Sequence, residues 1–379
     1  MVFLYALAAV VLINCGYYLL FSKFSFSKTS ETAPKTIQGA VKESNSSTKA
    51  KLQPVSLIVC AKNEVENLKI HIPFWLEQNH PDFELILIDD ASSDNTLAVM
   101  EWFKEQHPKI QIVKVKNNEA FWGNKKYALT LGLKRAKNQH LLFTDADCKP
   151  ASKDWLTTMT AHFSEEKQLV LGYGAYQKKP GLLNRFIRFE TLMTALQYFS
   201  YAKAKMPYMG VGRNLAYTAK LYYDNKGFMS HIKLSSGDDD LFVNEAATPE
   251  NTAICVSEEA FTYSIPKKTW KGWWRQKKRH ITTAKHYKPI HKFLLGLFYT
   301  SNLLFWVLSI ISFIVVSWKI TLALILFRFI FQYIIVGKAA KKLKESDLAP
   351  YIPLFELFLV CYQMSIFISN SRTKHNRWK

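Results

Sequence analysis

Two aspartates separated by one residue, Asp145 and Asp147, lie at the end of a short apolar run, HLLFTD, that is typical of a buried β-strand. Carboxylate oxygens are the ligands that hard divalent cations prefer, and a cation held by two of them keeps positions open for phosphate oxygens. The pair therefore predicts a metal site for a phosphorylated ligand. An acidic loop without a ligand is the alternative, because a D-x-D pattern alone often occurs by chance.

Three adjacent aspartates, Asp238, Asp239 and Asp240, form the second candidate for chemistry. Because like charges repel, at least one of these carboxyl groups is expected to have a raised pKa, which suits general-base catalysis. Two other interpretations remain open. The run could be a solvated acidic loop, or it could cap the helix-like segment LFVNEAA that follows it.

Polar residues also follow two other apolar runs. Asn63 and Glu64 lie in the segment that follows VSLIVC. Asp89 is the last residue of ELILID, and Asp90 follows it. One carboxylate of this aspartate pair can accept hydrogen bonds from a nucleobase or a ribose. Asp94 is expected only to serve as the N-cap of the next helix.

Lys125 opens another helix-like stretch, directly after Gly123 and Asn124. A helix N-terminus favours anions, so the ammonium group of Lys125 could reach a phosphate there. A solvated lysine is the alternative.

These residues need a scaffold, and the pattern of the chain predicts one. Apolar runs that read as strands alternate with helix-like stretches, which predicts an α/β fold with a mostly parallel, Rossmann-like sheet covered by helices on both faces. The expected strands are 55–60, 84–89, 110–115 and 140–145, and the expected helices are about 65–79, 94–106 and 124–137. In such sheets, ligands bind outside the carboxyl ends of the strands, where the acidic motifs fall.

Membrane segments flank this soluble region. Residues 2–22 carry no charge and are long enough to cross a bilayer. Because Lys23 and Lys28 follow this run instead of preceding it, we expect an uncleaved anchor with its C-terminal side in the cytoplasm.

Three further apolar segments, 293–318, 320–337 and 351–369, lie near the C-terminus, and Arg328 interrupts the second. The basic segment 338–344 indicates a cytoplasmic position. With the catalytic region inside, four full spans would place the basic tail RTKHNRWK outside, against the positive-inside tendency. One apolar segment could therefore lie in the interface or re-enter the membrane.

The stretch 265–292 holds ten lysines and arginines, three tryptophans and no acid, and the whole chain has a net charge of +20. This composition suits the lipid headgroup zone, where indole rings are partly wet and cations meet phosphate. Nucleic-acid binding is not expected, because the stretch runs directly into a membrane segment. Residues 181–205 read either as a second interfacial helix or as a core helix. The five cysteines are scattered and predict neither a zinc site nor a disulfide framework.

Taken in order, seven pieces of the chain resemble the family 2 glycosyltransferases with a GT-A fold, over roughly residues 54 to 281. These pieces are VSLIVCAKNE, LILIDDASSDNT, GNKKYALTLGL, TDAD, MGVGRNLAY, SGDDDL and QKKRH. The resemblance implies inverting transfer from a nucleoside-diphosphate sugar, usually a UDP-sugar, with Mg²⁺ or Mn²⁺ as cofactor.

The resemblance also implies a role for individual residues. Asp90 would contact the base, Glu64 would lie near the nucleoside, and Asp147 would bind the metal. Counting back from Leu241, as in the family's E-D-x-D-L pattern, selects Asp238 as the general base, with Asp239 as its rival. The full set comprises Asp238 and Asp239 for catalysis; Asn63, Glu64, Asp90, Lys125, Asp145, Gln276 and Arg279 for the donor; Asp145 and Asp147 for the metal; and Asp240, His280, Trp273 and Trp274 for the acceptor side.

One departure concerns the acceptor side. Membrane-bound members often carry Q-x-x-R-W on an interfacial helix, whereas here Gln276 and Arg279 are followed by His280. The diphosphate role of Arg279 is retained, but the stacking role of the tryptophan would have to pass to Trp273 or Trp274.

The predicted architecture has six segments. They are a transmembrane anchor (1–22), a flexible linker (23–53), a GT-A catalytic domain (54–264), a basic Trp-rich interfacial segment (265–292), C-terminal transmembrane segments (293–369) and a basic tail (370–379).

This layout resembles that of ceramide glucosyltransferases. We therefore expect a multi-pass protein of the cell membrane, with a cytoplasmic catalytic domain that glycosylates a membrane lipid. The alternative is a processive polysaccharide synthase subunit that extends a cell-surface glycan. A membrane scaffold with a degenerate transferase domain is a third interpretation, which the intact acidic motifs disfavour.

Overall fold

The computed structural model of the 379-residue chain describes residues 1–28, 52–116 and 125–372. Most of the expected linker and of the basic tail, together with Gly123 and Asn124, lie outside the described residues. The chain forms two compact units, which are described separately. Within the described residues, the sheet unit comprises residues 28, 52–116, 125–177 and 207–266, and the helical unit comprises residues 1–27, 178–206 and 267–372.

Four parallel strands form one half of the main sheet in the sheet unit. They are β1 (Val55–Ala61), β2 (Phe83–Asp89), β3 (Ile110–Lys114) and β4 (His140–Asp145), and each boundary lies within one residue of its prediction. The register pairs Ala61 with Asp89 and Cys60 with Asp145. Because the strands end level with one another, the polar residues that follow them meet at one edge of the sheet.

The second half of the sheet is mixed. The strand order is β3-β2-β1-β4-β8-β6-β9, in which β8 (Leu215–Thr218) runs antiparallel to β4 and to β6 (Leu169–Leu171), and β9 (Thr252–Ile254) runs parallel to β6. A smaller sheet joins β5 (Cys148–Pro150), β10 (Thr262–Ser264) and β7 (Gly174–Tyr176).

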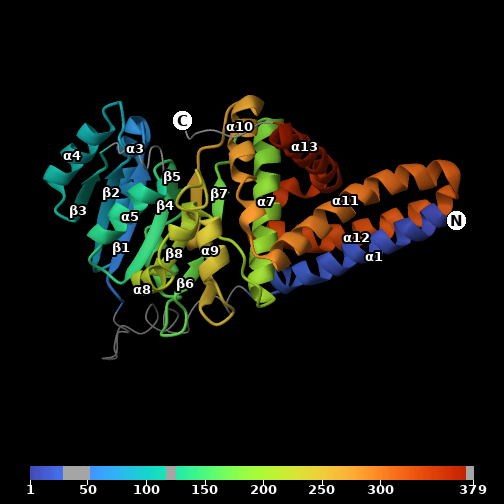
Figure 1. The fold of residues 1–379 in the computed structure, drawn as a ribbon, viewed down its shortest axis with the longest axis horizontal. Helices are drawn as coiled ribbons and strands as arrows, with labels where there is room; N and C mark the ends of the chain where they lie inside the picture. The colour runs from blue at the N-terminus through green and yellow to red at the C-terminus, as the bar shows by residue number, and fades with distance from the viewer. Residues whose placement is uncertain (29–51, 117–124, 373–379) are drawn as a thin grey trace. The chain divides into compact units, whose positions relative to one another are not determined.

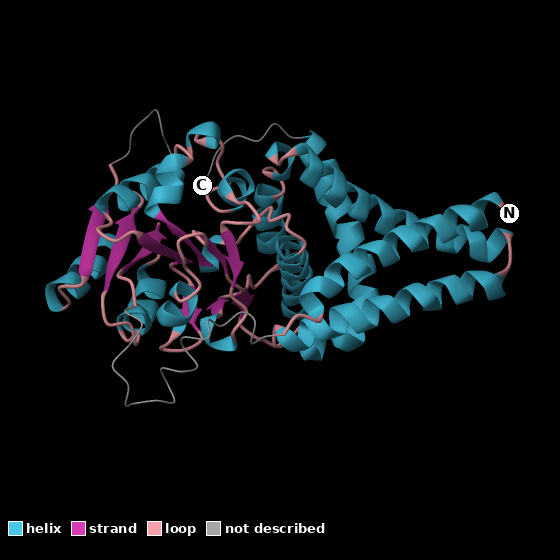
Figure 2. Cartoon of the chain, turned by 90° about the horizontal axis from the view of Figure 1, so that it is seen from below, coloured by secondary structure: helices cyan, strands magenta, loops and turns pink. Residues whose placement is uncertain are grey.

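Helices cover both faces of the main sheet, as Figure 2 shows. The helices of this unit are α3 (Val65–Leu76), α4 (Thr96–Gln106), α5 (Lys125–Arg135), α6 (Trp155–Thr160), α8 (Ala219–Asp224) and α9 (Asp240–Ala246). Leu57 and Val59 of β1 pack in one core with Ile72 of α3. On the other face, Gly132 of α5 lies so close to the sheet that a Cβ atom there would be 2.2 Å from Cδ1 of Ile88. The predicted α/β class is confirmed.

The expectation that Asp94 is the N-cap of α4 was wrong by one residue, because Asn95 occupies that position. Asp94 instead accepts hydrogen bonds from the backbone N–H of Thr96 (3.0 Å) and from its hydroxyl (2.5 Å). The same hydroxyl oxygen accepts the N–H of Glu64 at 2.8 Å. Asp94 thus helps to hold together the loops that follow β1 and β2.

Four helices of the helical unit are long and apolar enough to cross a membrane: Val2–Ser25 (α1), Pro289–Val315 (α11), Trp318–Lys342 (α12) and Ser346–Ser369, which includes most of α13 (Ile352–Arg372). Three of them, α1, α11 and α12, run side by side (Figure 1). Phe305 of α11 packs with Leu7 and Val11 of α1.

The helix α7 (Leu182–Lys203) is a core helix of the helical unit. Most of its side chains are buried, and the ring of Phe199 stacks on Phe24 of α1 with 4.9 Å between the ring centroids. Of the two interpretations of residues 181–205, the structure supports the buried helix. This segment packs with the apolar helices, although its sequence lies inside the expected catalytic segment.

Arg328, which interrupts the apolar run of α12, is fully buried within the helical unit. Its guanidinium group donates to Asn14 of α1 (2.5 Å), to Asn302 of α11 (2.6 Å) and to Glu356 of α13 (2.8 Å). The carboxylate of Glu356 therefore offsets the buried positive charge, and the two amide oxygens accept further hydrogen bonds from the guanidinium group. Together these contacts join four helices at one point.

The two ends of α13 make polar contacts with two other helices of this unit. Asp347, just before α13, pairs with Arg188 of α7 at 2.6 Å. Near the other end, Ser369 accepts a hydrogen bond from Lys278 of α10 (Trp270–His280) at 3.0 Å. The N-terminal end of α13 therefore lies near α7, and its C-terminal end lies near α10.

Candidate active site at the carboxyl end of the sheet

A pocket opens in the sheet unit where β1 and β4 end and α5 begins. Its wall combines apolar side chains with two kinds of charge, a lysine and three carboxylates. The lining residues are Ile58, Cys60, Lys125, Leu129, Phe143, Thr144, Asp145, Gly212, Leu215, Tyr217, Asp238 and Asp239. The edge of the sheet at which the strands end thus contains a pocket that is lined by both charged and apolar side chains.

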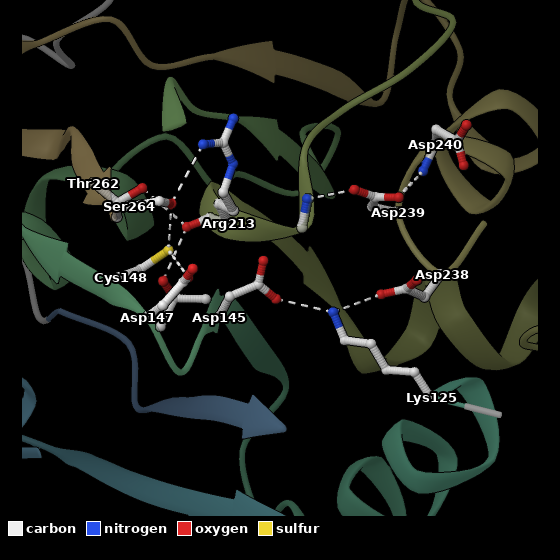
Figure 3. A network of polar contacts seen from close by, with 12 residues as sticks. Lys125, Asp145, Asp147, Cys148, Arg213, Asp238, Asp239, Asp240, Thr262 and Ser264 are labelled. Carbon is white, nitrogen blue, oxygen red and sulfur yellow. Dashed lines mark hydrogen bonds and ion pairs between the residues drawn. The ribbon is translucent and has the colours of Figure 1, made fainter. Parts of the chain in front are cut away.

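Lys125 connects the two acidic motifs across this pocket (Figure 3). Its Nζ atom lies 2.9 Å from Oδ1 of Asp145 and 3.0 Å from Oδ2 of Asp238. Burial alone would lower the pKa of Lys125, but the two carboxylates raise it well above its usual value. Lys125 is therefore a fixed cation at the first position of α5.

Asp238 and Asp239 differ in their protonation. Burial would raise the pKa of Asp238, but the ammonium of Lys125 outweighs burial and holds this pKa below its usual value. Burial and the neighbouring charges of Asp238 and Asp240 raise the pKa of Asp239 to about 7. At neutral pH, Asp238 is thus ionised, whereas Asp239 is close to half protonated.

The carboxylate of Asp239 is engaged by backbone groups. Oδ2 accepts the N–H of Gly212 at 2.7 Å, and Oδ1 accepts the N–H of Asp240 at 2.8 Å, which makes Asp239 the N-cap of α9. Asp240 is the first residue of that helix and accepts the N–H of Leu241. The capping interpretation of the acidic run therefore applies to Asp239, while Asp238 pairs with Lys125.

Asp145, Asp147 and Cys148 place one possible ligand atom each within 4.8 Å of one another. Burial raises the pKa of the Cys148 thiol well above its usual value, and this thiol donates a hydrogen bond to Asp147 at 3.4 Å. The two carboxylates supply hard oxygen ligands, whereas the protonated thiol orients one of them. This donor set fits a hard divalent cation such as Mg²⁺ or Mn²⁺.

Arg213 lies near these aspartates, and no role for it was predicted from the sequence. Its guanidinium group stacks over the ring of Tyr176 at 4.3 Å and donates to Ser264 at 3.3 Å. Gly174 leaves room for this side chain, because a Cβ atom there would lie 3.1 Å from Cβ of Arg213. The piece MGVGRNLAY contains the residue, but only the fold brings it beside Cys148 and the D-x-D pair.

Asp90 is buried at the carboxyl end of β2, and only 6% of it is exposed. Its N–H donates to the carbonyl of Ala61 at 2.9 Å, and within the described residues its carboxylate accepts no hydrogen bond. Burial raises the pKa of Asp90. A buried carboxylate in this position is ready to accept hydrogen bonds from a ligand.

Asn63 and Glu64 follow β1 and serve first to join two loops. Asn63 adopts a left-handed conformation with a φ of 58°, and its side-chain oxygen accepts the N–H of Ser93 at 2.8 Å. Glu64 precedes α3, and its carboxylate accepts a hydrogen bond from Asn67.

The remaining predicted site residues lie on α10 in the helical unit: Trp273, Trp274, Gln276, Arg279 and His280. The side chain of Trp273 is fully buried there. Trp274 is partly exposed and contacts the ring of Tyr362 edge-on at 5.4 Å. Of the two tryptophans proposed to stack on an acceptor, only Trp274 thus presents accessible surface.

Comparisons with known proteins support this description. Residues 56–217 match the sequence profile described as Glycosyl transferase family 2. A stretch of 128 residues is 27% identical to UDP-Glc:alpha-D-GlcNAc-diphosphoundecaprenol beta-1,3-glucosyltransferase WfaP of Escherichia coli, and covers 33% of this chain and 47% of that protein. A longer stretch of 250 residues is 25% identical to the probable glycosyltransferase YdaM of Bacillus subtilis, and covers 60% of this chain and 54% of that protein. The chain thus spans about half the length of these relatives.

Among solved structures, the mannosyltransferase PcManGT from Pyrobaculum calidifontis, in complex with GDP-Man and Mn2+, resembles the chain with a TM-score of 0.59. The match covers 97% of this chain and 100% of that chain at 16% sequence identity. At this identity the likeness shows the fold.

Proposed function

The chain is a family 2 glycosyltransferase through its residues 56–217, and on this premise we propose that it transfers a sugar, with inversion, from a nucleoside-diphosphate sugar to a lipid in its own membrane. One observation carries the proposal. Lys125 contacts Asp145, beside the candidate metal ligands, and also Asp238, the candidate base. In the proposed reaction, the metal site beside Asp145 would hold the donor diphosphate on one side of the reacting carbon. Asp238 would meet the acceptor hydroxyl on the opposite side.

The donor side consists of cations and carboxylates that suit a diphosphate. Asp145 and Asp147 would hold Mg²⁺ or Mn²⁺, which when bound would offset the negative charge of the diphosphate. Lys125 would bind a phosphate oxygen, and the guanidinium group of Arg213, which lies near Cys148 and the two aspartates, would add a second positive charge. These cations stabilise the charge that develops on the leaving diphosphate.

The nucleobase would be held by the carboxylate of Asp90, with Asn63 and Glu64 at the neighbouring loop. A carboxylate accepts hydrogen bonds, and both uracil and guanine carry ring N–H donors that could supply them. We propose a UDP-sugar as the donor. The relative from E. coli is named for UDP-Glc, whereas the structural neighbour was solved with GDP-Man, so both donor classes belong in the test.

Asp238 is the proposed general base. Its carboxylate would accept the proton of an acceptor hydroxyl while that oxygen forms a bond to the anomeric carbon. The bond between this carbon and the diphosphate oxygen breaks on the opposite face, and the electron pair leaves with the diphosphate. Asp239 is less suited to this step, because backbone N–H groups occupy both of its oxygens.

The Q-x-x-R pattern on α10 adds further residues to the proposal. Gln276 and Arg279 belong to the donor side by this resemblance, and Asp240, His280 and Trp274 belong to the acceptor side. Trp273 packs inside the helical unit, so its contribution would be to fix α10.

A lipid acceptor fits the printed names of several relatives. One is named for a diphosphoundecaprenol acceptor, and another, a cholesterol galactosyltransferase from Borreliella burgdorferi, is 32% identical over 93 residues. The second candidate function is a polysaccharide synthase, because a poly-beta-1,6-N-acetyl-D-glucosamine synthase of Staphylococcus epidermidis is 30% identical over 96 residues.

We also propose a topology with three spans. The helices α1, α11 and α12 would cross the membrane, while α13 would remain at the cytoplasmic interface, where α7 and α10 contact its two ends. This arrangement keeps the catalytic domain and the basic C-terminal tail on the cytoplasmic side, as the positive-inside tendency requires. A membrane-impermeant thiol reagent should then label Cys361 of α13, which is exposed in the structure, in inside-out membrane vesicles but not in sealed cells. A spanning α13 would instead keep Cys361 in the hydrocarbon core, so labelling from outside, or no labelling from either side, would contradict this topology.

The function is tested with the purified full chain in lipid nanodiscs. Radiolabelled UDP-sugars and GDP-mannose are supplied with Mn²⁺ and total membrane lipid, and the products are separated into an organic phase and a high-molecular-weight fraction. The lipid proposal expects label in the organic phase from a UDP-sugar, with only a small residual rate of transfer by the Asp238→Asn variant. Label in long polymer would instead support the synthase, and no transfer from any donor would contradict both.

A further inference from the structure

Lys126 follows Lys125 in the sequence, but its side chain points into the protein and not into the pocket. Only 1% of the residue is exposed. Its Nζ atom donates hydrogen bonds to the backbone carbonyls of Leu234 and Ser236, at 2.6 and 2.7 Å. Burying an ammonium group is costly unless acceptors replace the lost water, and here two carbonyls of one segment do so.

The segment that Lys126 binds leads directly to the acidic motif. Residues 232–239 connect the short 3₁₀ turn Met229–His231 to α9, and they form turns and bends without a strand or helix of their own. Such a segment has few internal hydrogen bonds to define its path. The position of Asp238 therefore depends on contacts that other elements make with this segment.

Gly237 adds to this dependence. Its φ of +103° lies in the region that favours glycine, and a Cβ atom there would lie 2.4 Å from Cδ1 of Leu241. The E-D-x-D-L pattern has a glutamate at this position, whereas the glycine here has no side chain that could hold the segment through a contact. The carbonyl just before this turn, that of Ser236, is one of the two that Lys126 binds.

Two consecutive lysines at the start of α5 thus bind the segment 234–238 in two ways. Lys125 binds the side chain of Asp238 at 3.0 Å, and Lys126 binds the backbone two and four residues earlier. Burial lowers the pKa of Lys126 to about 8, although the three aspartates oppose this effect. The ammonium form that donates to the two carbonyls is therefore the main form at neutral pH.

We propose that Lys126 is a positioning residue for catalysis, which fixes the segment 234–238 so that the carboxylate of Asp238 faces the pocket. The inference deepens the proposed function and rests on it in one respect, namely that Asp238 is the base. Lys126 does not touch the substrates; it acts through the backbone of the segment that carries Asp238.

The test replaces Lys126 by Met and by Gln in the full chain, with Lys134→Met as the matched control. Lys134 lies on the same helix but is exposed and outside the site. Turnover and donor KM are measured for sugar transfer, and amide hydrogen exchange is measured over residues 232–240. We expect Lys126→Met to lower kcat by about 100-fold with donor KM nearly unchanged, because a small displacement of a catalytic group has effects of this size. Lys126→Gln, which keeps a donor, should lose less, and Lys134→Met should resemble the wild type.

A double variant separates positioning from a general loss of stability. If Lys126 acts through Asp238, adding Lys126→Met to Asp238→Asn should lower the residual activity little further. An equal additional loss, or an unchanged kcat in Lys126→Met, would overturn the proposal. Hydrogen exchange tests whether Lys126 fixes this segment, and it does not depend on enzyme activity. The amides of residues 232–240 should exchange faster in Lys126→Met than in Lys134→Met. If the wild type transfers no sugar, the proposed function fails, and unchanged exchange would then also refute the structural role of Lys126.

Discussion

The ammonium nitrogen of Lys125 lies 3.0 Å from a carboxylate oxygen of Asp238, and the same nitrogen lies 2.9 Å from Asp145. One side chain thus connects the acid of the candidate donor site to the acid of the candidate acceptor site. A diphosphate that binds Lys125 would compete with Asp238 for this cation. The ion pair would therefore couple donor binding to the charge environment of the proposed base.

Replacing Lys125 by Met should impair the donor site and shift the pH dependence of transfer. Lys125 lowers the pKa of Asp238, so its removal raises that pKa. Because the base must be deprotonated, the acidic limb of the kcat/KM profile should move to higher pH. The pH profile of the variant checks this, together with an increase in donor KM. An acidic limb at the wild-type pH would mean that Asp238 is not the titrating base.

Replacing Asp147 by Ala should abolish transfer without unfolding the protein, since Asp147 is partly exposed and its proposed role is that of an oxygen ligand to the metal. We expect a loss of at least about 1,000-fold, the order of magnitude for removing a main electrostatic element of an active site. Transfer assays and a calorimetric Mn²⁺ titration measure the effect. Glu166→Gln, at an exposed acid of the same unit, is the control. Normal turnover by the alanine variant would refute the metal role.

Asp238 and Asp239 can be distinguished by paired asparagine variants. Asp238→Asn removes the proposed base and should reduce turnover to a small residual rate while donor binding persists. Asp239→Asn should retain measurable turnover, because an amide oxygen can still accept one backbone N–H at the start of α9. Turnover assays and donor binding by calorimetry are the measurements. The opposite ranking of the two variants would assign the base to Asp239.

The raised pKa of Asp239 also predicts how stability changes with pH. Its carboxyl shifts from an ordinary 3.8 to about 7 in the folded protein, so the folded state binds more protons than the unfolded state in this window. Stability should therefore decrease as pH rises from about 4 to about 7, and Asp239→Asn should weaken this dependence. Thermal unfolding of both proteins at about pH 5 and about pH 8 compares them. Identical slopes would contradict the assigned shift.

Arg213 should contribute to donor binding through its charge. We expect Arg213→Met to raise donor KM by about tenfold, consistent with the loss of one charge-assisted contact. Gly174→Ala should have a smaller effect in the same direction, because the added Cβ would lie 3.1 Å from the Arg213 side chain and displace it. Donor KM and UDP inhibition constants are the measurements, with Lys153→Met, an exposed cation of the same unit, as control. An unchanged donor KM in Arg213→Met would remove this residue from the donor site.

The sequence was sufficient to predict the parallel half of the sheet. The runs VSLIVC, ELILID and HLLFTD are mainly apolar at their centres, as is typical of strands buried on both faces, and their limits agree with β1, β2 and β4 to within one residue. The strands β6 and β9 have three residues each, and such short segments carry no recognisable period. The mixed half of the sheet was therefore not predictable in detail.

The aspartates of the site could be predicted because carboxylates that follow predicted strands suit metal binding and base catalysis. The contacts that these aspartates make could not be predicted. The pairing of Lys125 with Asp238 and the grip of Lys126 on the carbonyls of Leu234 and Ser236 join distant parts of the chain. Arg213 escaped attention because its neighbours on the D-x-D side come from other strands. Residues 181–205 likewise left two interpretations open, an interfacial helix or a core helix, and only the structure shows that α7 packs with the apolar helices.

The junction around Arg328 has a consequence for the biosynthesis of this protein. Its bond to Asn14 joins residues that are 314 positions apart, so α1 leaves the ribosome long before its partner exists. Until α12 arrives, Asn14 lacks this bond, and α12 in turn carries an arginine that an isolated helix would expose to lipid at a cost of about 2.5 to 3.5 kcal/mol. We therefore expect α12 to integrate more readily when α1 still lies beside it and offers Asn14 as an acceptor. The order of translation would then matter, as well as the final contacts, for the assembly of these apolar helices.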